Sequence, residues 1–185
     1  MLSKHKYLTE KFIRKYSDKV DWEYIIIYQA LSEDFIREFK NKVKWNLIFR
    51  YQQLSEDFII EFKDKCYWDT ISNKQKLSEN FIRKFQNKVD WFGISKYQKL
   101  SLKFIEEFQS RVDWTAISYS QKLSEDFIIK FKDKVSWKDI SYFQSLSLKF
   151  IIENIDNLNI KLIFANDFIS EEIKQDLKMY LDVLS

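Results

Sequence analysis

Residues able to perform nucleophilic chemistry are scarce in this chain of 185 residues, which holds one histidine, His5, and one cysteine, Cys66. A reactive thiol needs a nearby base or positive charge. Cys66 stands where most copies of a repeated motif carry valine, so we interpret it as a small buried hydrophobic residue. His5 has no evident partner that would make it a general base. The sequence therefore predicts no pair of nucleophile and base.

Neighbouring carboxylates are a second source of chemistry, because two acids can divide the roles of proton donor and acceptor. Such pairs occur at Glu33 and Asp34, at Glu56 and Asp57, and at Glu125 and Asp126. Each pair directly follows a serine, which is typical of the first turn of a helix, where carboxylates complement the helix dipole. We interpret the pairs as helix-start residues.

Cofactor and metal motifs are also missing from the pattern. The only glycine is Gly93 and there is no proline, so no glycine-rich phosphate-binding loop can be written. We expect no catalytic residues, no metal site and no cofactor, and we expect that the protein is not an enzyme.

The tryptophans show instead how the chain is built. They lie 23 residues apart, at Trp22, Trp45, Trp68, Trp91, Trp114 and Trp137. Exposed tryptophans could stack on bases or sugars. A bulky aromatic residue that returns at a fixed interval is more typical of a repeat protein, in which each copy buries it against the next. We therefore assign the tryptophans to the structural core.

The repeat can be numbered from its first leucine. Seven copies begin at Leu8, Leu31, Leu54, Leu77, Leu100, Leu123 and Leu146. Position two is Ser or Thr, position five is Phe and position six is Ile in all seven copies, and position nine is aromatic in six. Positions one, five and nine share a face of a helix, and the hydroxyl at position two suits its N-cap. This predicts a first helix of about nine residues in each copy.

A second helix is predicted from the tryptophan at position 15 to about position 22. Asp21, Asp90, Asp113 and Ser136 precede the tryptophan as candidate N-caps, whereas Lys44 and Tyr67 break this pattern. Position 22 is glutamine in the first six copies: Gln29, Gln52, Gln75, Gln98, Gln121 and Gln144. The glutamine shares a face with the tryptophan and an isoleucine, so we expect its amide to bind turn backbone or to form a ladder along the stack.

The predicted fold is an all-α solenoid of about seven to eight stacked short helical hairpins with degenerate terminal caps. We treat residues 1–185 as a single domain. Residues 1–7 form an N-terminal half repeat, residues 8–145 form six full repeats, and residues 146–168 form a degenerate seventh. Residues 169–185 are expected to form a C-terminal capping helix, with Ser170 as its N-cap and a stripe of Ile173, Leu177, Leu181 and Leu184.

Charge and composition limit the partners and the cellular compartment that we expect for this protein. Basic and acidic residues number 31 and 28, which gives a net charge of +3 and no strong field for a polyanion. We find no signal peptide and no apolar run of the roughly 20 residues that would span a bilayer. We therefore expect an intracellular protein in a reducing compartment.

Function is expected where the copies differ, at positions 16, 17 and 20 of the second helix. Solenoids bind partners through such variable faces. The predicted partner-binding residues are Tyr24, Leu47, Arg50, Phe92, Lys96, Tyr119 and Tyr142. The alternative is a solvated face that drifts without function, but exposed aromatic residues favour protein binding. Two other functions stay open: a structural subunit that self-associates, and a nucleic-acid-binding repeat protein, which the balanced charge disfavours.

The motif LSEDFI, followed by DKVxW and YQ-type positions, is almost complete from Leu123 to Gln144. It resembles the short repeats of poorly characterised proteins from giant amoeba-infecting DNA viruses of the mimivirus group, over about residues 1–165. The resemblance implies a helical repeat scaffold in the cytoplasm of an infected host cell, and capture of a host or viral protein as its function. It supplies no catalytic residues.

Overall fold

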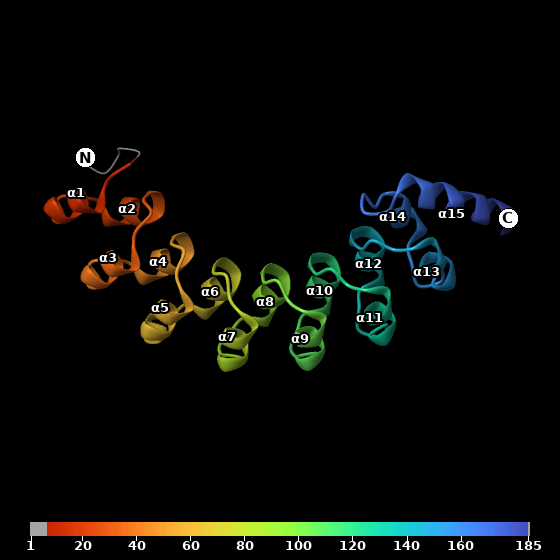
Figure 1. The fold of residues 1–185 in the computed structure, drawn as a ribbon, viewed down its shortest axis with the longest axis horizontal. Coiled ribbons are helices and arrows are strands. Elements are labelled where there is room, and N and C mark those ends of the chain that lie inside the picture. Colours follow the sequence, from red (N-terminus) through yellow and green to blue (C-terminus); the bar gives the residue numbers. More distant parts are fainter. Residues whose placement is uncertain (1–6, 185) are drawn as a thin grey trace. The chain divides into compact units, whose positions relative to one another are not determined.

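The computed structural model describes residues 7–184, so residues 1–6 of the expected half repeat, with Leu2, Ser3 and His5, lie outside the described residues. Residues 7–184 form fifteen α-helices, one 3₁₀ helix and no strand, which confirms the all-α repeat fold (Figure 1). The helices group into two compact units, Met1–Asp90 with α1 to α7 and Trp91–Ser185 with α8 to α15. No helix within residues 7–184 is both long and apolar enough to cross a bilayer.

The first helices of the repeats begin where the N-cap pattern predicts. In all seven copies, the hydroxyl at position two accepts a hydrogen bond from the backbone N–H of the phenylalanine at position five. These helices are α1 (Glu10–Lys15), α3 (Glu33–Glu38), α5 (Glu56–Glu61), α7 (Glu79–Lys84), α9 (Leu102–Glu107), α11 (Glu125–Lys130) and α13 (Leu148–Glu153).

The first helices are shorter than the predicted nine residues. Each has 6 residues, because position nine is the C-cap and not part of the helix. At Phe39, for example, φ is −105° and ψ is 24°, so the aromatic side chain continues the apolar stripe after the helix has ended. A turn follows, which in the third copy is the 3₁₀ helix η2 (Lys63–Lys65).

The second helices begin at the tryptophan. They are α2 (Trp22–Tyr28), α4 (Trp45–Tyr51), α6 (Trp68–Lys74), α8 (Trp91–Tyr97), α10 (Trp114–Ser120), α12 (Trp137–Phe143) and α14 (Ile160–Phe164). Asp21, Asp113 and Ser136 cap their helices as predicted, and Lys44 and Tyr67 make no side-chain cap. The glutamine after the helix is extended, with φ of −100° and ψ of 142° at Gln52. The chain thus turns without glycine or proline.

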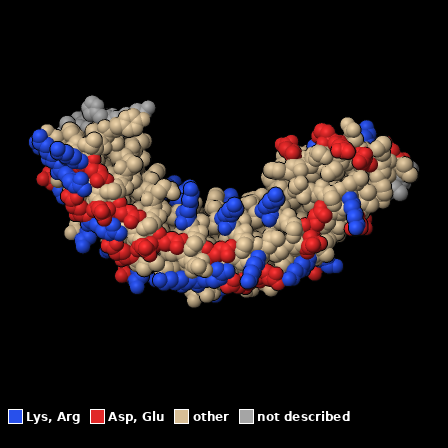
Figure 2. All heavy atoms as spheres, viewed as in Figure 1, with Lys and Arg blue, Asp and Glu red and all other residues tan. Residues whose placement is uncertain are grey.

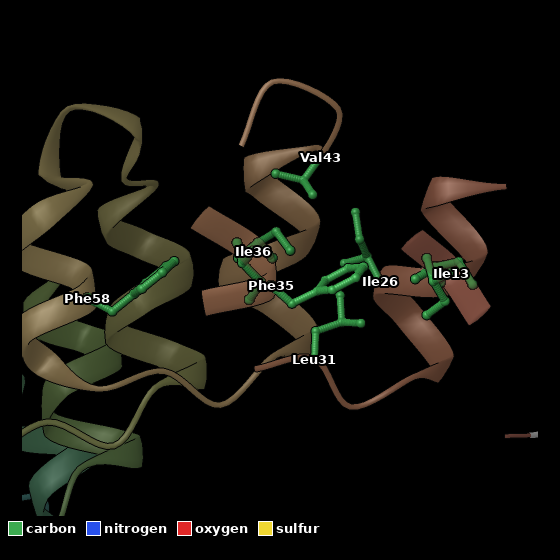
Figure 3. Packing of buried hydrophobic residues seen from close by; sticks show 9 residues of the cluster. Ile13, Ile26, Leu31, Phe35, Ile36, Val43 and Phe58 are labelled. Atoms are coloured by element: carbon green, nitrogen blue, oxygen red, sulfur yellow. The ribbon is translucent and has the colours of Figure 1, made fainter. Parts of the chain in front are cut away.

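Stacking of these hairpins forms the core. Within the first unit α2 packs on α4 and α4 on α6, and within the second α8, α10, α12 and α14 pack in succession. Ile13, Ile26, Phe35 and Ile36 are fully buried and belong to one cluster with Phe58, so side chains from three consecutive copies meet (Figure 3). A short helix of 6 or 7 residues is unstable alone in water, and this burial supplies its stability.

The C-terminal end follows the predicted register. Asn159 caps α14, and Ser170 accepts from the N–H of Ile173 at the start of α15 (Glu171–Leu184). Leu177 is fully buried, Ile173 and Leu181 are half-buried, and α15 packs on α13. This helix therefore covers the last hairpin.

Candidate functional site

The invariant glutamines are buried and connect neighbouring copies. In the first unit the Gln52 amide N–H groups donate to the carbonyls of Ile26 and Gln29, at 2.5 and 2.8 Å, and its oxygen accepts from Leu31 N–H at 2.9 Å. In the second unit Gln144 makes the equivalent three bonds. Its amide N–H groups donate to the carbonyls of Ser118 and Gln121, and its oxygen accepts from Leu123 N–H. Each of these amides therefore makes hydrogen bonds to the backbone on both sides of the preceding turn.

In the degenerate seventh copy, a different residue makes the equivalent hydrogen bonds to the backbone. Its position 22 is Asp167, but the neighbouring Asn166 is buried and donates to the carbonyls of Ser141 and Gln144 at 3.0 and 2.8 Å. Its oxygen accepts from Phe168 N–H at 2.7 Å. The shorter amide acts from position 21, a register shift that the sequence pattern did not reveal.

Buried serines at position 19 add a second line of connections. Ser118 donates to the carbonyl of Trp114 at 2.7 Å and accepts from Ser136 N–H of the next copy at 2.9 Å. Ser95 and Ser141 repeat this arrangement in the second unit. In the first two copies Ile26 and Phe49 fill this position, so packing replaces the hydrogen bonds there.

The tryptophans lie at the junction of consecutive copies and are half-buried. The Trp68 ring centroid is 4.9 Å from that of Phe85 in the next copy, and the Lys88 ammonium lies 5.5 Å from the Trp68 ring. Trp22 donates its indole N–H to the carbonyl of Ser17 at 3.0 Å. Trp114 and Trp137 make the same backbone bond, so the indoles are held by packing between copies and, in these three, by a hydrogen bond.

The glutamates of the acidic pairs do more than start a helix. The carboxylate of Glu56 accepts from the backbone N–H of Ser78 at 2.5 Å, one copy further on. Glu33 binds Ser55 N–H and Glu125 binds Ser147 N–H in the same way, both at 2.6 Å. The carboxylate at position three therefore joins neighbouring copies, a role that their separation in sequence hid.

Cys66 is half-buried in the turn before α6. Its thiol points at the carbonyls of Ile59 and Phe62, with sulfur to oxygen distances of 3.6 and 3.5 Å. Burial raises the pKa of the Cys66 thiol to about 12, although the Lys88 charge opposes this. A hollow of about 420 Å³ lies beside it, lined also by Lys44, Asn46 and Tyr67. At neutral pH the sulfur is a thiol and a poor nucleophile.

The predicted partner-binding residues do not all lie on one exposed face. Arg50, Phe92 and Tyr142 are exposed, whereas Lys96 and Tyr119 are half-exposed. All six residues at position 16, which vary from copy to copy, are exposed: Glu23, Asn46, Asp69, Phe92, Thr115 and Lys138.

Position 17 departs from the expected outward orientation. Gly93 and Ala116 are buried there, and Leu47 packs against the core. The ring of Tyr24 is half-buried, 4.4 Å from that of Tyr28. Consecutive second helices pack directly on one another, so position 17 meets a neighbour and is only partly available to a partner.

An aromatic set at position 21 was missed in the sequence. Tyr28, Tyr51, Tyr97 and Phe143 occupy it and are exposed. Position 21 is aromatic in four of the first six copies, which could have been noticed, but regular aromatics also occur in the core. The position lies on the last helical residue before the buried glutamine, where the chain turns away and leaves the ring in solvent. We call positions 16, 20 and 21 together the second-helix face.

In the second unit this face carries a continuous aromatic cluster. The Lys96 ammonium lies 5.1 Å from the ring centroid of Tyr97, 5.7 Å from Tyr119 and 5.6 Å from Phe92. A hydrogen bond with Tyr97, and then the electrostatic interaction with Tyr119, raise the pKa of Lys96. The Phe143 ring lies 6.0 Å from Tyr119 and 4.8 Å from Tyr142. Lys96 is therefore a cation surrounded by aromatic rings.

Two adjacent hollows follow the cluster. The first, of about 580 Å³, is lined by Tyr97, Lys99, Ser120 and Lys122 among others. The second, of about 380 Å³, shares Ser120 and Lys122 and adds Phe143 and Phe168. We call the two hollows together the aromatic groove. An equivalent hollow of about 320 Å³ in the first unit lies between Tyr28 and Tyr51.

The remaining visible surface has both signs of charge. Lys, Arg, Asp and Glu side chains are interspersed over each unit (Figure 2). Many are paired between copies, as in Arg14 with Glu38 at 2.7 Å and Arg37 with Glu61 at 2.8 Å. Such exposed pairs contribute little stability.

Comparison of the chain with protein families, with curated proteins and with solved structures found no match. The site is therefore interpreted from its own geometry.

Proposed function

We propose that this protein is a non-catalytic scaffold that binds another protein through the second-helix face. The observation that supports this is a division of roles within each copy. Invariant glutamines and tryptophans are used in holding copies together, while the exposed residues beside them differ from copy to copy. Repeat proteins recognise partners by varying such a face on a fixed framework.

The composition of the face agrees with protein binding. Tyr97 and Phe92 have 53% and 47% of their surface exposed, and Phe143 has 38%. Tyrosine, tryptophan and arginine dominate the binding energy of protein interfaces, and large rings lose little entropy on binding. The cost of keeping such rings in water is explained if a partner covers them.

Capture from lysate with matched variants tests the proposal. The face variant carries Phe92→Ser, Tyr97→Ser, Tyr142→Ser and Phe143→Ser. The control carries Ile129→Ser in α11 and Met179→Ser in α15, which are also exposed apolar residues. The resemblance to giant-virus repeats makes an amoeba the host lysate to use. All three proteins must first show the same thermal unfolding.

The proposal is supported if the natural chain and the control capture a protein whose binding persists after nuclease treatment, and the face variant does not capture it. Capture that disappears with nuclease would instead establish nucleic-acid binding. Recovery of the chain alone, with concentration-dependent assembly, would establish a self-associating structural subunit.

A further inference from the structure

We propose that the aromatic groove of the second unit binds a short acidic peptide segment of another protein that carries one large apolar side chain. This inference rests on the proposed function and specifies its partner. The groove runs over Lys96, Tyr97, Tyr119, Phe143 and Phe168, all from the second unit.

The groove has the size and lining of a side-chain site. Its two hollows, of about 580 and 380 Å³, lie within the range of roughly 300–1,000 Å³ typical of ligand sites. Phe143 and Phe168 line the second hollow, and Phe168 is 62% exposed. Burying apolar surface there stabilises a complex by about 25 cal/mol per Å². A leucine or phenylalanine of the partner therefore fits the apolar end.

The lysines of the groove indicate which residues flank the apolar side chain of the partner. The residues that line the two hollows include Lys96, Lys99 and Lys122 and no carboxylate. Lys99 and Lys122 are exposed. Opposite charges across an interface steer association and select the partner. Aspartate or glutamate on both sides of the apolar anchor would meet these lysines.

The corresponding hollow in the first unit has no such charge. Position 23 supplies Lys99 and Lys122 in the second unit, but it is Ala30 and Gln53 in the hollow between Tyr28 and Tyr51. The two sites share a helical framework and paired aromatic residues and differ in the lysines. The first unit therefore provides a control site within the same protein.

Ring geometry favours a peptide over single-stranded nucleic acid. Base binding uses aromatic faces on which successive bases stack. Here the planes of Tyr142 and Phe143 meet at 88°, and those of Tyr119 and Phe143 at 55° with centroids 6.0 Å apart. These rings pack against one another at steep angles, which differs from a row of parallel faces on which successive bases would stack.

Panning a displayed library of random short peptides on the full chain tests the assignment. Enriched peptides are synthesised and titrated by fluorescence polarisation at about 0.15 M salt, where exposed charges beyond about 8 Å are screened. The variants are Tyr97→Ser with Phe143→Ser, and Lys99→Glu with Lys122→Glu. The control is Tyr28→Ser with Tyr51→Ser, and unfolding curves show that each variant is folded.

We expect enriched peptides to combine Asp and Glu with a Leu or an aromatic residue. Both groove variants should weaken binding about tenfold or more, which corresponds to about 1.4 kcal/mol, and the control should leave it unchanged. Failure to enrich peptides, enrichment of neutral or basic ones, or equal binding by the groove variants would overturn the assignment. So would tighter, groove-dependent binding of a short oligouridine. If the groove variants still capture a partner from lysate and only the four-residue face variant does not, the proposed function would still hold although the peptide assignment fails.

Discussion

The glutamine at position 22 is the residue on which each junction depends most. Gln52 makes hydrogen bonds to three backbone groups, with lengths of 2.5 to 2.9 Å. The sequence indicated an inward amide because glutamine is invariant on an apolar helix face. The carbonyls that it pairs lie 23 and 26 residues earlier, so only the stacked structure identifies them.

Substitution of Gln52→Leu should lower the free energy of unfolding by about 3 kcal/mol, because buried backbone groups lose their partners. The neighbouring Gln53 is exposed, so Gln53→Leu should change it by less than about 0.5 kcal/mol. Urea unfolding followed by circular dichroism measures both. Equal values for the two variants would show that the amide bonds do not stabilise the junction.

Cys66 gives a prediction for pH. The pKa of its thiol is raised to about 12 in the folded protein, from the ordinary value of 9.0. The thiolate fraction at pH 8 is therefore smaller when the chain is folded than when it is unfolded. Labelling of the single cysteine by a disulfide reagent at pH 8 should be much slower in buffer than in urea, and it should accelerate up to about pH 12. Equal rates in buffer and in urea at pH 8 would contradict the half-buried, carbonyl-facing thiol.

At the level of the helices, two explanations exist for the acidic residues in the first turn: a hydrogen bond to the next copy, and interaction with the helix dipole. Glu56 and Asp57 both lie near the positive end of α5, but Glu56 alone receives the Ser78 N–H. Glu56→Ala should therefore cost about 1.5 kcal/mol, as expected for a hydrogen bond to a charged group. Asp57→Ala should cost about 0.5 kcal/mol, as a loss of dipole interaction alone. Thermal unfolding of the two variants measures both costs, and equal costs would favour the dipole explanation.

The tryptophan tests how helices of successive copies are held together. Trp68→Ala removes ring contacts to Phe81 and Phe85 and should cost about 3 kcal/mol, near the lower end for a large core truncation because the ring is half-buried. Tyr67→Ala, on an exposed neighbour, should cost less than about 0.5 kcal/mol. Chemical denaturation of both proteins provides the comparison. A stable Trp68→Ala protein would contradict the packing described for this junction.

Helix positions were more predictable than helix lengths and contacts. N-caps and the 23-residue period depend on local sequence, so Ser32 and Asp21 identified their helices correctly. Phe39 belongs to the apolar stripe but follows the helix end, and apolar periodicity does not distinguish these cases. Gly93 was expected on the outward side of its helix and is buried, because its environment depends on the neighbouring second helix. The aromatic groove combines residues of several copies and could not be located from one.

For the whole molecule, a fixed framework and a variable face explain why so repetitive a chain can be specific. Within each unit the second helices of successive copies pack on one another, and changes at exposed positions leave this core intact. The face is uneven along the chain: Arg50 and exposed tyrosines lie in the first unit, and the Lys96 cluster lies in the second. Different parts of the chain can therefore differ in what they bind.

A footprint of the bound complex tests the central claim most directly. Hydrogen exchange is followed by mass spectrometry for the protein alone and with the partner that it captures. We predict slower exchange in segments that contain α8, α10 and α12 with the turns after them, and unchanged exchange in α9 and α11. Protection confined to the first helices, or to α15, would contradict binding through the second-helix face.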